Sequence, residues 1–316
     1  MITRAETYKK AFEIKKENLL HKTKQSEMML AAAYATNSRL NEIDMMLSSL
    51  GAKLALTALS GDTIALQNIK AQSLALSNEK NAILDKLQVN DIVYDCPVCS
   101  DTGYVNGKIC ACVKKIANAI AREELSAQMP IKESTFENFD LKYYSSEGDN
   151  PRRRMTAILK LCREYVINFN PNSSENLLFL GGTGLGKTHL TLAIVSGVIE
   201  KGFLPVYGPA ETLFSAIQKE KYSGENQGCY DQMLNCDLLV IDDLGTEHVN
   251  SFTKSTLYNL INTRLLIKKP TIINTNLSLK EIQEIYSPRI ASRLIGNFNG
   301  NQFLGTDIRQ QKLLGK

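Results

Sequence analysis

The run GGTGLGKT, from Gly181 to Thr188, fits the pattern G-x-x-x-x-G-K-[ST] that cradles nucleotide phosphates. Its glycines let backbone N–H groups turn around the phosphates without clashes between Cβ atoms. Lys187 would neutralise the β- and γ-phosphates of ATP, and the Thr188 hydroxyl would ligate Mg²⁺. We expect the nucleotide to be surrounded by Gly181, Gly182, Thr183, Gly184, Leu185, Gly186, Lys187, Thr188 and His189. The His189 side chain itself is expected to pack or to face solvent.

The two flanks of this run provide the context that a phosphate-binding loop requires. A short apolar stretch, Asn176–Leu180, predicts a buried strand before the loop, and the apolar spacing over 189–200 predicts a helix after it. The N-terminus of such a helix adds a partial positive charge to the site. Strand, glycine-rich loop and helix in this order predict a P-loop.

A second predicted strand, DLLVIDD over 237–243, ends in two carboxylates. In a doubly wound sheet, functional groups gather at the carboxyl ends of the strands. Asp242 would hold Mg²⁺, directly or through water, and Asp243 would polarise the attacking water. Glu247, just beyond this strand, is a weaker candidate for a catalytic or subunit contact.

A third predicted strand, over 270–276, ends in polar amides. Asn276 at its tip could orient the water between the γ-phosphate and Asp243, with Asn274 as the fallback. Further on, Arg289 and Arg293 share one face of a predicted helix because they are four residues apart. A guanidinium group suits the stabilisation of charge in phosphoryl transfer, and an arginine given by a neighbouring subunit makes hydrolysis depend on assembly.

A cysteine cluster lies far upstream of these motifs. Its pattern is C-x2-C, ten residues, then C-x-C, and its members are Cys96, Cys99, Cys110 and Cys112. A C-x-x-C turn presents two thiolates to one tetrahedral Zn²⁺, although the final C-x-C is tighter than usual. Free thiols and an iron–sulfur cluster are the alternatives. With all positions filled by cysteine the zinc would be structural: it would stabilise a segment too small to fold alone and rigidify the joint between the helical N-terminal arm and the ATPase domain.

The elements that must position these groups divide the chain into parts. We expect a helical N-terminal region over 1–92, a small zinc-binding module with four cysteines over 93–115, a linker helix over 116–130 and an α/β domain over 131–316. Helical periodicity marks 37–50 and 63–87, with breaks expected at Gly51 and at the turn 60–62. The methionines at 28–29 and 45–46 are expected in the core rather than on a binding surface. The Asn- and Gly-rich segment 297–305 is expected to be a loop or a short hairpin.

Composition sets the limits of these expectations. The chain has 316 residues and a formal charge of +4, which permits contact with nucleic acid without requiring it. The run Arg152–Arg154 is expected to be a solvated surface, and the isolated Cys162, Cys229 and Cys236 to be packing residues. No apolar run is long enough for a membrane span, and the charged N-terminus does not resemble a signal peptide, which together predict a cytoplasmic protein.

The order of these motifs resembles that of the AAA+ ATPases of the DnaC/DnaI helicase-loader family. The resemblance rests on GGTGLGKTHL, DLLVIDDLGTE, LYNLINTRL, TIINTNLS and SPRIASRLIG, and it extends upstream to STFENFDLKYYS. It implies a P-loop parallel sheet sandwiched by helices, with a reduced lid because only 23 residues follow Arg293. It assigns Lys187 and Thr188 to the Walker A motif and Asp242 and Asp243 to the Walker B motif.

The same resemblance implies further roles and partners. Asn276 would be the first sensor, Arg293 the arginine finger and Arg309, in GTDIRQQK, the second sensor, while Arg264 matches a family position without an assignable mechanism. The implied function is ATP-controlled placement of the hexameric replicative helicase onto single-stranded DNA. The N-terminal part would grip the helicase, and the ATPase part would assemble with its own copies along the DNA.

Two other functions remain open from the sequence. One is a transposition helper ATPase of the IstB type, with a transposase and duplex DNA as partners; the cysteine-bearing helical arm argues for the loader. The other is a scaffold that binds ATP but barely hydrolyses it, against which the intact Asp242, Asp243 and Arg293 argue.

Overall fold

The computed structural model describes residues 4–60, 62–89, 92–128, 133–223 and 228–314. The chain divides into two compact units, one comprising Phe12–Val113 and the other Lys114–Lys316 together with Met1–Ala11. The predicted domain boundary at 130–131 and Gly61 of the predicted turn lie outside the described residues. No helix in the described ranges is long and apolar enough to cross a membrane.

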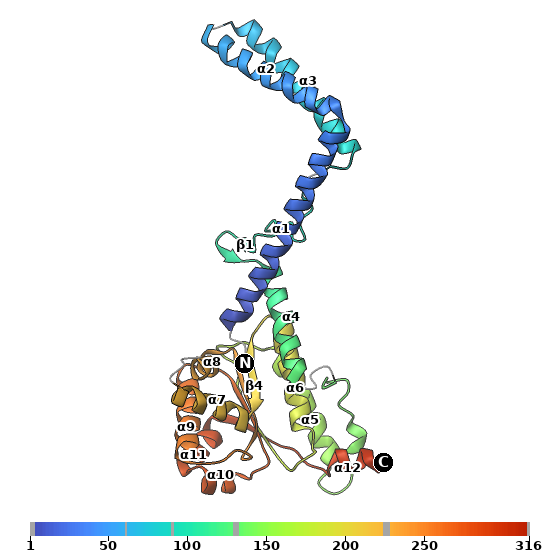
Figure 1. The fold of residues 1–316 in the computed structure, drawn as a ribbon. Coiled ribbons are helices and arrows are strands. Elements are labelled where there is room, and N and C mark those ends of the chain that lie inside the picture. Colours follow the sequence, from blue (N-terminus) through green and yellow to red (C-terminus); the bar gives the residue numbers. More distant parts are fainter. Residues whose placement is uncertain (1–3, 61, 90–91, 129–132, 224–227, 315–316) are drawn as a thin grey trace. The chain divides into compact units, whose positions relative to one another are not determined.

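A five-stranded parallel sheet forms the centre of the larger unit (Figure 1). Its order is β4-β5-β6-β3-β7. The strands are β3 (Asn176–Leu180), β4 (Pro205–Pro209), β5 (Leu238–Leu244), β6 (Thr271–Thr275) and β7 (Phe298–Gln302). Because β3 lies between β6 and β7, the loop that follows β3 opens at the carboxyl edge beside the ends of β5 and β6.

Helices cover both faces of this sheet. Those of the larger unit are α4 (Ala111–Gln128), the 3₁₀ turn η1 (Leu141–Tyr143), α5 (Pro151–Ile167), α6 (Lys187–Glu200), α7 (Ala210–Ser223), α8 (Cys229–Asn235), α9 (Ser251–Leu266), α10 (Leu279–Ile285), α11 (Pro288–Asn297) and α12 (Ile308–Leu313). Alternation along β3 sends Leu177 and Phe179 into the core under α5 and α6, and Leu178 and Leu180 into the core under α7 to α11. The predicted α/β sandwich is thereby confirmed, and in the described chain the lid after β7 is reduced to the single short helix α12.

The segment 297–305 was expected to be a loop or hairpin, and this expectation is wrong. Phe298–Gln302 form β7, which pairs in parallel with β3 along its whole length. The Phe303 N–H continues the ladder by donating to the Leu180 carbonyl at 2.7 Å, and the Phe303 ring is buried. Strand β3 supplies a complete row of hydrogen-bonding partners, so tertiary pairing overrides the low β-propensity of the Asn and Gly residues.

The smaller unit consists of long helices followed by a hairpin. Its elements are the greater part of α1 (Arg4–Thr36), α2 (Ser38–Ser60), α3 (Thr63–Lys86) and the two-stranded pair β1 (Tyr104–Val105) and β2 (Lys108–Ile109). Helices α2 and α3 pack against each other, and the ion pairs Arg39–Glu79 and Lys80–Asp44 join them. The predicted helices are confirmed, although Gly51 lies inside α2 rather than at its end.

The methionine groups were predicted to be core, and the structure contradicts this. Met28 and Met45 are 73% and 68% exposed, and Met29 and Met46 are exposed as well. The helices of this unit bury few large side chains, so positions at helical spacing are left on its surface.

Candidate nucleotide-binding site and cysteine cluster

A cavity of about 320 Å³ opens at the carboxyl edge of the sheet, around the loop between β3 and α6. The sequence-predicted residues that line it are Thr183, Gly184, Leu185, Gly186, Lys187, Thr188, His189, Asp243, Asn276 and Arg309. The structure therefore brings together groups from the glycine-rich loop, from β5, from the end of β6 and from α12. Gly181, Gly182 and Asp242 lie next to these residues in the chain without lining the cavity.

The glycine-rich loop needs its glycines for backbone conformation. Gly184 and Gly186 have φ of +69° and +85°, in the left-handed region that side chains rarely adopt. A Cβ at Gly186 would also lie 2.7 Å from the Phe139 ring, and one at Gly184 would lie 2.1 Å from an oxygen of the Asp307 carboxylate. Glycine at these positions thus allows both the turn and the close approach of neighbouring segments.

Lys187 lies at the centre of this loop. Its ammonium donates to the carbonyls of Gly181 and Gly182 at 2.7 Å each and to Asn276 Oδ1 at 2.6 Å. Burial lowers the pKa of Lys187, while the carboxylates of Asp243 and Asp242 oppose this shift. An ammonium so placed can neutralise a phosphate that enters the loop.

Oxygen ligands suited to Mg²⁺ lie beside the loop. Thr188 Oγ1 donates to Asp242 Oδ1 at 3.3 Å, so a hydroxyl and a buried carboxylate converge where Walker motifs hold the metal. Asn274 is fully buried and donates to Asp242 Oδ1 at 2.6 Å, which places it behind the carboxylate rather than in the cavity. Between the two amides, Asn276 is therefore the one that can reach a nucleotide.

Asp243 differs from Asp242 in its surroundings. Its φ is +51°, and the pairing of β5 with β6 shifts register between Ile241 and Leu244, so the Asp243 side chain turns into the cavity. Burial and the neighbouring charge of Asp242 raise the pKa of Asp243. A raised pKa makes the Asp243 carboxylate a better acceptor for a proton from water.

Arg309 reaches the cavity from α12, whose N-terminus is fixed to the loop. The Ile308 N–H donates to the Gly184 carbonyl at 3.0 Å, and Asp307 caps the helix by accepting from the Arg309 N–H. Arg293 behaves differently. It is exposed on α11 and lines, with Arg289 and Tyr258, a separate cavity of about 390 Å³.

Several residues of the nucleotide cavity were not foreseen as site residues. Phe139 and Tyr143, which precede α5, form part of its wall together with Leu192 and Ile308. His189 also lines the cavity, with its Nε2 at 2.7 Å from the Thr135 carbonyl and its ring beside Phe139. The stretch STFENFD, which the sequence marked only by resemblance, was the available signal for this wall.

Arg264 and Glu247 make buried contacts that connect elements of the fold. The buried Arg264 guanidinium donates to Thr271 Oγ1 and to the carbonyls of Met233, Leu234 and Pro270. It thereby ties the end of α8 to the start of β6. Glu247 is buried against the Tyr286 hydroxyl and the Gly245 N–H, and it does not line the nucleotide cavity.

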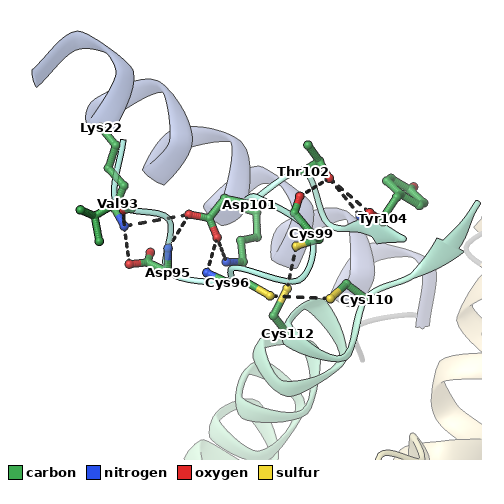
Figure 2. A network of polar contacts seen from close by, with 11 residues as sticks. Lys22, Val93, Asp95, Cys96, Cys99, Asp101, Thr102, Tyr104, Cys110 and Cys112 are labelled. Carbon is green, nitrogen blue, oxygen red and sulfur yellow. Dashed lines mark hydrogen bonds and ion pairs between the residues drawn. The ribbon is translucent and has the colours of Figure 1, made fainter. Parts of the chain in front are cut away.

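The four clustered cysteines converge in the smaller unit (Figure 2). Cys96 Sγ lies 3.8 Å from Cys110 Sγ, Cys99 Sγ lies 3.5 Å from Cys112 Sγ, and all four sulfurs fall within 4.8 Å of one another. Thiolates that bind one zinc ion tetrahedrally at about 2.3 Å lie about 3.8 Å apart. The donor set and its spacing therefore fit a structural zinc ion.

The rest of the module supports this convergence. The backbone N–H of Cys99 lowers the pKa of the Cys96 thiol to about 7, whereas burial raises the pKa of the Cys112 thiol. Asp101 accepts from the N–H groups of Asp95 and Cys96, and these hydrogen bonds hold the turn that carries Cys96 and Cys99 in place. A Cβ at Gly103 would lie 2.6 Å from the Phe12 ring of α1, so the hairpin needs glycine where it meets that helix.

Fold and site together define an ATP-binding P-loop protein of the AAA+ class. Residues 115–295, more than half of the chain, match the family model for IstB-like ATP binding proteins, and the chain belongs to this family.

Individual curated proteins are similar to this chain at low sequence identity. The chain is 29% identical over 169 residues to the replicative helicase loader DnaC of Escherichia coli strain K12, covering 52% of this chain and 64% of the relative. It is 25% identical over 122 residues to an insertion sequence IS21 putative ATP-binding protein of Pseudomonas aeruginosa, covering 39% and 46%. The chain thus spans less than two thirds of the length of each of these curated relatives.

Among solved structures, the crystal structure of the DnaC helicase loader matches at 25% identity and a TM-score of 0.46, over 54% of this chain and 98% of that one. AMPPCP-bound DnaA from Aquifex aeolicus matches at 22% identity and a TM-score of 0.47, over 58% and 55%.

Proposed function

We propose that this protein is an ATP-dependent loader that places a hexameric replicative helicase onto single-stranded DNA in the cytoplasm. The observation that carries the ATPase part is the single cavity shared by Lys187, Asp243, Asn276 and Arg309. The loader part is supported by the similarity to replicative helicase loaders over the matched 169 residues. Modest positive charge is compatible with sequence-independent contact to single-stranded DNA.

In the proposed reaction each residue of the nucleotide site has one role. Lys187 binds the β- and γ-phosphates, and Thr188 and Asp242 would hold Mg²⁺, which would supply positive charge to neutralise the phosphates. Asp243 polarises the water that attacks the γ-phosphorus, and Asn276 orients that water. Arg309 contacts the phosphates from α12. The wall formed by Phe139, Tyr143 and His189 binds the base.

Completion of the site depends on assembly in this proposal. Arg293 is exposed on α11 and does not line the cavity of its own chain. We assign it as an arginine finger that acts on the nucleotide of a neighbouring copy, which would make hydrolysis depend on oligomerisation along DNA.

The N-terminal part is the proposed partner-binding module. It comprises the helical region 1–92 and the module 93–115, with a structural zinc ion held by Cys96, Cys99, Cys110 and Cys112. A linker helix over 116–130 would connect this module to the ATPase domain over 131–316.

A second candidate is a transposition helper ATPase, which the family match and the insertion-sequence relative favour. Size-exclusion chromatography with light scattering on the full chain and the host's replicative helicase, with and without ATP, separates the two. We expect a stable complex with the helicase. No complex under either condition, together with competent ATP binding, would overturn the loader and favour a transposase as partner.

A further inference from the structure

Both carboxylate oxygens of Asp242 are held by side chains from the two strands that flank β5. The Tyr207 hydroxyl, on β4, donates to Asp242 Oδ2. The Asn274 amide, on β6, donates to Asp242 Oδ1 at 2.6 Å. Because β5 lies between β4 and β6, the carboxylate is gripped from both sides at the edge of the sheet.

The Tyr207 hydroxyl lies in surroundings that are otherwise apolar. Tyr207 is 5% exposed, and its ring belongs to the same core as Val240, its register partner on β5. A hydroxyl buried without a partner would cost stability, so its placement against Asp242 is specific.

Asn274 is oriented by the helix that carries Thr188. The Thr191 hydroxyl donates to Asn274 Oδ1 at 3.0 Å, which leaves the amide NH₂ to face Asp242. Thr191 is buried and lies three residues after Thr188 on α6. Helix α6, which carries Thr188, thus also orients the Asn274 amide. That amide in turn orients the Asp242 carboxylate.

We propose that Tyr207 and Asn274 are positioning residues that lock the Asp242 carboxylate in the orientation in which it holds Mg²⁺ beside Thr188. With Oδ2 taken by the phenol, Oδ1 is the oxygen that faces the Thr188 hydroxyl, at 3.3 Å. The inference rests on the proposed ATPase function, because it needs Mg²⁺ and nucleotide but neither helicase nor DNA. Partners of this kind typically change metal affinity by about 10- to 100-fold when they are removed.

The test is Tyr207→Phe, which removes the hydroxyl and keeps the ring that fills the core. Binding of fluorescent mant-ADP to the full chain is titrated first in EDTA and then at increasing Mg²⁺. We expect unchanged affinity in EDTA and an increase of about tenfold in the Mg²⁺ concentration that gives half of the metal-dependent signal. Asn274→Ser, which shortens the second donor, should shift the same midpoint and serves if Tyr207→Phe folds poorly.

Two comparisons separate positioning from general destabilisation. Tyr286→Phe removes another buried tyrosine hydroxyl that donates to a carboxylate, that of Glu247, away from the cavity, and it should leave the Mg²⁺ midpoint unchanged. In an Asp242→Asn background, Tyr207→Phe should cause no further shift, because the group through which it acts is no longer a carboxylate.

Three outcomes would overturn the inference. The first is an unchanged Mg²⁺ midpoint in both Tyr207→Phe and Asn274→Ser. The second is a loss of mant-ADP affinity in Tyr207→Phe that is as large in EDTA as in Mg²⁺. The third is a shift of the Mg²⁺ midpoint by Tyr207→Phe that is as large in the Asp242→Asn background as in the unsubstituted chain. Failure of the unsubstituted chain to bind mant-ADP would instead overturn the proposed ATPase function, and this inference with it.

Discussion

The ammonium of Lys15, on α1, lies 2.6 Å from Asp101 Oδ1, and the two side chains are only 5% and 0% exposed. Asp101 belongs to the cysteine module and also accepts from the N–H groups of Asp95 and Cys96. One buried ion pair therefore connects the long N-terminal helix to the turn that carries Cys96 and Cys99. Because a buried charge without its partner is costly, the pair couples the order of the two segments.

Asp101→Asn is expected to weaken the cysteine module. It removes the carboxylate that accepts from the buried Lys15 ammonium, and removing one partner of a buried ion pair typically costs about 3–5 kcal/mol. We expect faster release of zinc to a chromogenic chelator. Asp95→Asn is the matched control, because Asp95 pairs with Lys22 at the surface, where an ion pair contributes about 0–1 kcal/mol. Equal release rates for the two variants would contradict a special role for the buried pair.

We expect the four clustered cysteines to hold one zinc ion. The sulfur separations fit one tetrahedral ion, so purified protein should contain one zinc per chain and show no visible absorption. Elemental analysis measures this, and Cys99→Ser should remove the metal while leaving mant-ADP binding in place. Iron and a visible chromophore would instead identify an iron–sulfur cluster.

Gly184→Ala is expected to reduce nucleotide affinity about tenfold or more, because φ is +69° and the new Cβ would lie 2.1 Å from the Asp307 carboxylate. The strain would fall on the contact between the loop and α12. Gly182→Ala is the control. Gly182 is not among the glycines with positive φ, and the nearest atom to its Cβ would be Leu185 Cδ1 at 4.0 Å. Fluorescence titration with mant-ADP compares the two, and similar losses would show that the loop tolerates neither change.

The parts of the site that the sequence could predict are those with a local pattern. Lys187, Asp243 and Asn276 each follow a short apolar strand, and in a parallel sheet the carboxyl ends of strands meet at one edge. Their convergence in one cavity confirms that geometry. Their catalytic roles, and that of Arg293, stay predictions.

The parts that could not be predicted depend on packing between distant segments. Phe139 reaches the cavity because Gly186 has no side chain in its way, a relation that spans 47 positions of the chain and leaves no periodicity. Strand β7 forms because β3 offers it a ladder, not because of its own residues. Arg264 is matched by resemblance, yet only its buried partners at α8 and β6 explain it.

Asp243→Asn is expected to keep nucleotide binding and to lower the rate of ATP hydrolysis by about 100-fold or more. Asparagine tolerates the left-handed backbone found at this position, with φ of +51°, so the change should stay local. Mant-ADP titration and steady-state phosphate release measure the two properties separately. Unchanged hydrolysis would remove Asp243 from the reaction, and a chain with equally negligible hydrolysis before and after the change would be a scaffold.

Arg293→Ala is expected to lower DNA-stimulated hydrolysis by about 1,000-fold without changing nucleotide affinity, because Arg293 does not line its own chain's cavity. Arg289→Ala is the matched control, since Arg289 lies one turn earlier on the same exposed face of α11.

Mixing decides whether the finger acts between chains. Arg293→Ala retains an intact nucleotide site, and Asp243→Asn retains an intact finger, so an interface at which the Asp243→Asn chain offers its Arg293 to the site of the Arg293→Ala chain contains a complete site. Hydrolysis should return when the two inactive variants are mixed, with a maximum near equal amounts. A mixture as inactive as its components, or an Arg293→Ala chain that hydrolyses ATP at the full rate, would show that Arg293 does not complete a neighbour's site.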